Sequence, residues 1–144
     1  MNEKHTQTNT ATQTIREEPV HSEAETNDQR QEEKNRAIKT ARIRTVNDVF
    51  RQTFIGGKVM LTQGIQQMPE TDMESIITQV RQFNDFTEEN DPHGEHDFGI
   101  IRHNKESVYW KIDYYNKAMD GGSEDPSDPK LTTRVLTIMR ASEY

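Results

Sequence analysis

The sequence predicts an α+β fold in which two helices pack on an antiparallel sheet of about four strands, preceded by a disordered polar N-terminal tail. Three observations support this prediction. All ten aromatic residues lie at or beyond Phe50, so the core belongs to the later part of the chain. Two segments carry apolar residues at helical spacing. Four shorter segments are rich in apolar or β-branched residues and are typical of strands.

Residues 1–36 are predicted to form a polar tail that is disordered or partly helical. The first forty residues contain no Leu, Phe, Trp or Tyr, so they cannot bury enough apolar surface to offset the entropy of ordering the chain. Glu, Gln, Lys and Arg are frequent in residues 28–39 and favour helix, which leaves the start of the first helix open. Residues 37–144 have the length of a single α+β domain.

The first helix is predicted to stop at Gly56-Gly57, because glycine commonly ends a helix. Its predicted apolar face consists of residues at helical spacing, namely Ile38, Ala41, Val46, Val49, Phe50 and Thr53. The short apolar segment from Lys58 to Thr62 lies between glycines, which predicts a strand.

The second helix is predicted to begin near Thr71. Thr71 and Glu74 have the spacing of a capping box, in which each side chain accepts a hydrogen bond from the other residue's backbone amide. The residues behind this box form one apolar stripe: Met73, Ile76, Ile77, Val80 and Phe83. We interpret this stripe as core packing.

The remaining strands are predicted at Asp97 to His103, Ser107 to Tyr115 and Leu131 to Met139. Side chains alternate along a strand, so the second of these strands is predicted to turn Val108, Trp110, Ile112 and Tyr114 toward the core. A three-residue loop, Asn104 to Glu106, would join the first two of them into a hairpin. This loop pairs apolar residues across the hairpin, Phe98 with Ile112 and Ile100 with Trp110. A two-residue loop would break this match, because a shift of one residue turns every side chain to the opposite face.

The predicted register brings charged residues together. Asp97 falls opposite Asp113, and Lys111 lies beside them. Because like charges opposite each other destabilise a sheet, this pairing requires either neutralisation by Lys111 or a bound cation, unless the register differs. Lys111 and Asp113 are the candidate catalytic residues under the cation interpretation, and under the other they form an exposed ion pair flanked by tyrosines.

The densest cluster of candidate metal ligands in the chain is His93, Glu95, His96 and Asp97, with Asp113 as a fifth ligand from the neighbouring strand. Imidazole and carboxylate groups together suit zinc, manganese or iron, and carboxylates with water suit magnesium. A divalent metal cofactor is therefore one interpretation. The other is an acidic loop that caps the strand, because the spacing of these residues matches no established metal motif.

Composition excludes several classes of protein. The chain has no cysteine, which excludes a disulfide scaffold, a cysteine nucleophile and a thiolate zinc site. A net charge of −7 argues against direct binding to nucleic-acid backbones. The absence of an apolar segment long enough for a membrane span leads us to expect a cytoplasmic protein with no membrane partner.

Four sequence segments resemble an uncharacterised bacterial family, a domain of unknown function found in small proteins that are often plasmid-borne. They are Asn47 to Phe54 followed by Gly56-Gly57, Asn90 to Gly99, Trp110 to Tyr115, and Thr132 to Met139. The resemblance covers Asn47 to Tyr144. The family pattern more often has Tyr at the position of His93, which implies that His93 is not an obligatory ligand. The resemblance implies a domain and a mobile-element origin, without a chemistry.

The leading hypothesis is a small accessory or binding protein. Its protein partner would contact the acidic loop, through Glu95, His96 and Asp97, and a tyrosine-bearing sheet face with Tyr109 and Tyr115. Tyrosine is good interface material because it buries a large area at a low entropic cost. Arg134 is a further candidate binding residue because its guanidinium can bind an anion.

Two alternatives remain from the sequence. The first is a hydrolase dependent on a divalent metal, such as a phosphodiesterase or nuclease, centred on Asp97, Lys111 and Asp113. The second is an acidic mimic of nucleic acid that inhibits a DNA-binding enzyme. It rests on six acidic residues between Asp85 and Asp97 with no lysine or arginine among them.

Overall fold

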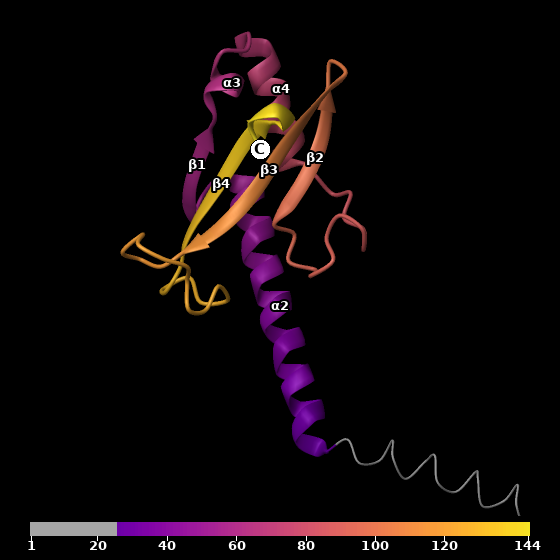
Figure 1. Ribbon diagram of the computed structural model, residues 1–144, viewed down its shortest axis with the longest axis vertical. Helices are drawn as coiled ribbons and strands as arrows, with labels where there is room; N and C mark the ends of the chain where they lie inside the picture. Colours follow the sequence, from indigo (N-terminus) through magenta and orange to yellow (C-terminus); the bar gives the residue numbers. More distant parts are fainter. Residues whose placement is uncertain (1–25) are drawn as a thin grey trace, which may run out of the picture. The chain divides into compact units, whose positions relative to one another are not determined.

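The computed structural model describes residues 26–144, and the predicted disorder of residues 1–25 lies outside this range. The elements in chain order are α2 (Asn27–Thr53), β1 (Gly57–Leu61), α3 (Gln63–Gln66), α4 (Glu70–Arg81), β2 (Phe98–His103), β3 (Glu106–Tyr115), β4 (Thr133–Arg140) and the 3-10 helix η1 (Ala141–Glu143) (Figure 1). The chain divides after Ala37 into two units, and the sheet lies in the second. Within residues 26–144, no helix is long and apolar enough to cross a membrane.

The sheet has four strands in the order β1-β4-β3-β2, which confirms the predicted α+β class. The pairs β2–β3 and β3–β4 are antiparallel, as predicted. The prediction of a wholly antiparallel sheet is wrong, because β1 runs parallel to β4, with Gly57 paired to Arg134. A parallel pair needs a long crossover connection, and the helices and the hairpin between β1 and β4 supply it.

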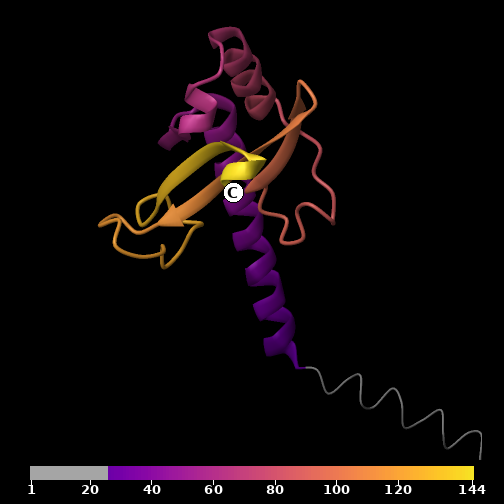
Figure 2. The same ribbon diagram turned by 45° about the horizontal axis from the view of Figure 1, so that its top comes forward.

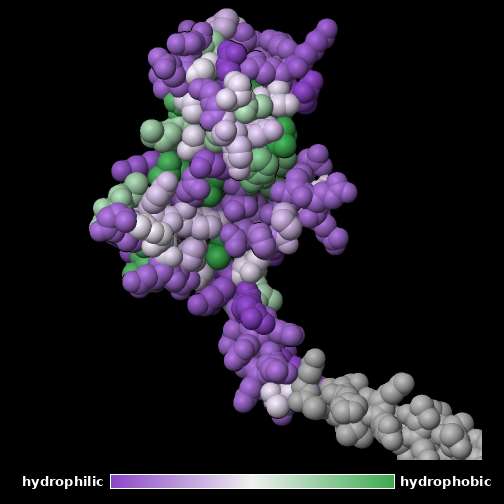
Figure 3. Space-filling view, viewed as in Figure 1, coloured by the Kyte–Doolittle hydropathy of each residue, from purple (hydrophilic) through white to green (hydrophobic). Residues whose placement is uncertain are grey.

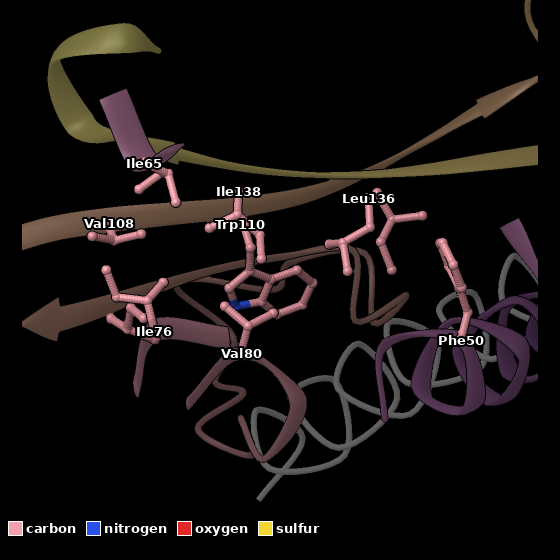
Figure 4. Close-up of a cluster of buried hydrophobic side chains, with 10 residues drawn as sticks. Phe50, Ile65, Ile76, Val80, Val108, Trp110, Leu136 and Ile138 are labelled. Atoms are coloured by element: carbon pink, nitrogen blue, oxygen red, sulfur yellow. The ribbon is translucent and has the colours of Figure 1, made fainter. Parts of the chain in front are cut away.

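The core lies on one face of the sheet, which we call the inner face. Two views show the later part of α2 passing behind the strands (Figures 1 and 2), and α4 contributes Ile76 and Val80 to the same core. Val108, Trp110 and Ile112 of β3 are buried there, which confirms the predicted alternation. The same cluster contains Leu136 and Ile138 from β4 with Phe50, Ile65, Ile76 and Val80 from the helices (Figure 4). The predicted core role of the α4 stripe is therefore confirmed.

The hairpin register differs from the prediction by one residue. Asn104 and Lys105 form a two-residue turn with φ values of 48° and 66°, so His103 pairs with Glu106. Two consecutive positive φ angles are typical of the tight turn whose twist matches that of the flanking strands. The predicted pairs Phe98–Ile112 and Ile100–Trp110 are therefore wrong: Phe98 pairs with Lys111 and Ile100 with Tyr109, on the outer face of the sheet.

The structure adds two short helices that were not predicted, α3 and η1, and it corrects two details of the longer helices. The buried residues of α2 are Ile43, Asn47, Phe50 and Arg51. Ile38 and Val49, which were predicted to face the core, are each 52% exposed, because polar contacts of Asn47 and Arg51 set the rotation of the helix instead. The capping box at Thr71 is wrong, since α4 begins at Glu70 after Pro69 and has no side-chain cap.

Candidate functional site

The predicted meeting of Asp97, Lys111 and Asp113 does not occur. The backbone carbonyl of Asp97 accepts a hydrogen bond from the amide of Ile112 at 2.8 Å, so Asp97 lies beside an inner-face residue. Lys111 and Asp113 lie on the outer face, where Lys111 Nζ is 2.9 Å from Asp113 Oδ2. The sequence-based pairing of Asp97 with Asp113 failed because it depended on a three-residue hairpin loop.

The candidate metal ligands do not form a coordination group. Within residues 26–144, no three or more His, Asp or Glu side chains are arranged to hold a metal ion. His93 is exposed, whereas Glu95, His96 and Asp97 are half-buried and Asp113 lies across the sheet from them. In the structure this segment is an irregular loop that leads into β2.

His96 anchors the loop to α2. Its backbone φ is 56°, and its ring stacks on that of Phe86 with centroids 3.6 Å apart. Its Nδ1 lies 2.8 Å from Asp48 Oδ1, and its backbone amide donates to Asp91 Oδ1 at 3.2 Å. The imidazole therefore lies between two carboxylates, since Asp91 Oδ2 is 3.7 Å from its Nε2.

Arg51 extends the same contact into the core. Its Nη1 is 3.0 Å from Asp48 Oδ1, and its Nη2 donates to the carbonyl of Phe83 at 3.2 Å. The guanidinium lies 5.2 Å from the ring centres of both Phe86 and Trp110, a cation–π arrangement. A buried arginine with an ion pair and two aromatic neighbours holds α2 against the loop and the sheet.

A second buried network joins Asn47, Glu95, Tyr114 and Arg134. Asn47 Nδ2 donates to the Tyr114 hydroxyl at 2.8 Å and to the Glu95 carbonyl at 3.0 Å. The Tyr114 hydroxyl donates to Glu95 Oε1 at 2.7 Å, and Arg134 Nε donates to Asn47 Oδ1 at 2.7 Å. One asparagine thus connects a helix, a loop and two strands of the sheet.

The electrostatics of this inner region follow from burial. Burial, followed by the hydrogen bond to Glu95, strongly raises the pKa of Tyr114, which keeps its hydroxyl protonated as a donor. Burial also raises the pKa of Asp97, with further contributions from the charges of Glu95 and Asp91. Burial lowers the pKa of Arg134. The Tyr114 hydroxyl therefore stays a donor to Glu95 Oε1, and this bond joins β3 to the loop.

Asn47, Asp48 and Arg51 are site residues that the sequence pattern did not predict. They lie on α2, and their spacing of three and four residues places Asn47 and Arg51 on one helix face with Ile43 and Phe50. A polar pair in a stripe otherwise occupied by apolar residues was the available signal.

Of the six acidic residues from Asp85 to Asp97, only Asp85, Glu88 and Glu89 are exposed.

The outer face of the sheet carries the predicted tyrosines. Tyr109 and Tyr115 flank the Lys111–Asp113 ion pair on β3, and the carboxylate of Asp113 raises the pKa of Lys111 by accepting its hydrogen bond. Tyr144, which follows η1, lies with its ring centre 5.4 Å from that of Tyr109. A hollow of about 380 Å³ on this face is lined by Lys111, Asp113, Tyr115 and Tyr144 among others.

The register shift adds apolar residues to the outer face. Phe98 packs edge-on against Tyr109 with ring centres 5.6 Å apart, and Ile100 is exposed beside it. Met60 lies on β1, the edge strand opposite β2, and is also exposed on the outer face, because it pairs with Thr137. The space-filling view shows apolar residues interspersed with hydrophilic ones over the strands (Figure 3).

Comparison with known proteins identifies a family that the chain matches. The family model described as a protein of unknown function (DUF3768) matches residues 61–143. This range contains three of the four segments on which the resemblance rested, and the segment from Asn47 to Gly57 lies outside it. No curated protein and no solved structure matches the chain.

Proposed function

Because the chain belongs to the DUF3768 family, which is described as being of unknown function, we propose a function from its geometry: a small binding protein whose outer sheet face contacts a protein partner. The resemblance of its sequence segments extends this proposal to a cytoplasmic protein of bacterial, mobile-element origin. The outer face carries the proposal, since helices α2 and α4 pack on the inner face (Figure 1).

The composition of the outer face supports a protein partner. Met60, Ile100 and Tyr144 are exposed, and the half-buried Tyr109 and Tyr115 lie among them. Protein interfaces are enriched in tyrosine and methionine, and an apolar centre with few charges is typical of them. The one charged pair at the centre, Lys111 with Asp113, is already neutralised within the face.

The acidic loop leads into β2, the edge strand that carries Phe98 and Ile100. Glu95 and His96 contact α2, and Asp91 accepts a hydrogen bond from the His96 amide within the loop, so these residues stabilise the loop rather than bind the partner. Three acidic residues of the loop are exposed and can attract a partner of opposite charge: Asp85, Glu88 and Glu89. We therefore expect the partner to present an apolar patch bordered by lysine or arginine.

The experiment compares two substitutions at equally exposed residues. Ile100 on the outer face and Leu131 in the loop before β4 are both 44% exposed, so Ile100→Glu and Leu131→Glu introduce the same charge with similar risk to folding. The full chain is tagged and purified from its own host cells under mild conditions. Wild type and Leu131→Glu should retain the same co-purifying protein, and Ile100→Glu and Tyr115→Ser should lose it.

Thermal unfolding of each purified variant checks that the fold is intact. Equal retention by all four proteins, with normal unfolding, would contradict the proposed role of the outer face. If only Leu131→Glu lost the partner, the binding surface would lie at the loop before β4 and not on the outer face.

A further inference from the structure

Arg134 is a buried cation without a direct carboxylate partner among residues 26–144. Its side chain points to the inner face from β4 and the residue is 2% exposed. Its Nε donates to Asn47 Oδ1 and its Nη2 to the carbonyl of Pro126. The remaining close neighbour is the ring of Tyr114, whose centre is 5.1 Å from the guanidinium carbon. Each of these partners is neutral.

A buried charge with neutral partners is costly, because it loses its hydration without gaining an opposite charge. The nearest acidic contribution comes from Glu95, and the Tyr114 hydroxyl already donates to that carboxylate at 2.7 Å. Burial lowers the pKa of Arg134. An arginine stays protonated under these conditions, so the site has a positive charge that an anion would stabilise.

Arg134 also lines a cavity whose other walls are apolar. The cavity has a volume of about 280 Å³ and lies between α2, the turn after it and the loop before β4. Val46, Val49, Phe50 and Ile55 form its apolar side, and Thr132 lies beside Arg134. No Asp or Glu lines it, although the chain has 25 acidic residues. Thr132 and Thr45, which also lines the cavity, donate their hydroxyls to backbone carbonyls, which leaves Arg134 as the available side-chain donor.

We propose that this cavity binds a small amphipathic carboxylate, with its carboxylate on Arg134 and its hydrocarbon part against Val49 and Ile55. The cavity is at the lower end of the range for small-molecule sites, so the ligand is small. A single guanidinium, with no lysine or second arginine in the walls, balances a monoanion rather than a phosphate dianion. This site is on the inner side of the sheet and is independent of the outer-face interaction.

Hexanoate and benzoate serve as probes, with hexan-1-ol and hexylamine as matched compounds that lack the negative charge. The measurements are the thermal midpoint of the full chain and the change in backbone amide resonances during titration. Both carboxylates should raise the thermal midpoint and shift the resonances of Val49, Ile55 and Thr132. The alcohol should bind at least tenfold more weakly and the amine should not bind.

Ile55→Glu separates binding from folding. Ile55 is 76% exposed, so the substitution leaves the core unchanged while it places a negative charge at the cavity. We expect the affinity for hexanoate to fall by at least roughly fivefold through like-charge repulsion. Leu131→Glu, which carries the same charge outside the cavity, should bind as wild type does. Arg134→Gln should abolish the preference for carboxylate over alcohol.

Three results would overturn the proposal: no response to either carboxylate, equal binding of hexanoate and hexan-1-ol, or unchanged affinity in Ile55→Glu. If Arg134→Gln does not fold, the first two comparisons and Ile55→Glu still decide the question.

Discussion

Trp110 occupies the space that a side chain at position 99 would need. Gly99 and Trp110 are register partners on β2 and β3, and a β-carbon on Gly99 would lie 2.4 Å from Trp110 Nε1 and 2.6 Å from its Cε2. The indole is fully buried, and its Nε1 has no hydrogen-bond partner among the described residues. The largest core side chain is thus packed directly against the backbone of an edge strand.

Gly99→Ala should therefore destabilise the protein. Real Cβ atoms do not approach neighbours this closely, so either β2 or the indole must move, at a cost of about 1–3 kcal/mol. Urea unfolding measures the change. Gly121→Ala is the control, because its nearest neighbour would be Asn116 Nδ2 at 3.6 Å, an ordinary contact. Equal stability of both variants would show that the indole does not pack on Gly99.

The two-residue turn of the hairpin can be tested at Lys105. Its φ of 66° is sterically unfavourable for a residue with a side chain, whereas glycine adopts it without a steric penalty. Lys105→Gly creates an Asn-Gly turn and should stabilise the protein by roughly 0.5–1 kcal/mol, whereas Lys105→Val should destabilise it. The thermal midpoint distinguishes the two variants. A stabilising valine would contradict the observed register.

Asn47→Ala should be strongly destabilising. The substitution removes the partner of Arg134 Nε and of the Glu95 carbonyl, both of which lie in the buried network. Each group left without a partner costs about 1–3 kcal/mol, so we expect a loss of roughly 2–4 kcal/mol in urea unfolding. Asn35→Ala, which removes an exposed hydrogen bond from Gln31, should change stability by less than about 0.5 kcal/mol. Similar losses in both variants would refute the role of the network.

The raised pKa of Asp97 leads us to expect that the stability of the protein depends on pH. Burial raises its pKa in the folded protein above the ordinary 3.8, so the folded state binds the proton more tightly than the unfolded chain. The carboxylate therefore lowers stability as the pH rises from 3.8 through the raised folded pKa, and the penalty persists above that window. Asp97→Asn should be more stable than wild type at pH ~7, with a difference that shrinks on acidification.

Denaturant unfolding from pH ~4 to ~7.5 measures this difference. Asp85→Asn, at an exposed position of the same loop, is the matched control and should follow wild type throughout. A lower stability of Asp97→Asn at neutral pH would show that the carboxylate has a favourable partner, contrary to the raised pKa.

The elements that the sequence predicted well are those with a clear local period. The alternation of β3 identified Val108, Trp110 and Ile112 as core residues because side chains of a strand alternate between faces. The stripe of α4 identified Ile76 and Val80 by the helical period. In both cases the buried residues are apolar, so the pattern and the burial agree.

The candidate site was harder to predict, for reasons visible in particular residues. Asn47 and Arg51 are buried on α2 in place of Val49, because hydrogen bonds to a loop 30 or more residues away satisfy their polar groups. The pairing of Asp97 with Asp113 failed because Asn104 and Lys105 both adopt positive φ, which shortened the turn by one residue. Neither the burial of these polar residues nor the length of the turn can be predicted from the local sequence.

The sequence by itself determined the α+β class, the strand count and the faces of β3, because periodic burial of apolar side chains depends on neighbours in the chain. Tertiary structure alone decided which faces of β2 and α2 are buried, that β1 runs parallel to β4, and that Arg134 lines an apolar cavity. Those features depend on contacts between segments far apart in sequence, where one residue of register or one buried hydrogen bond outweighs the local apolar pattern.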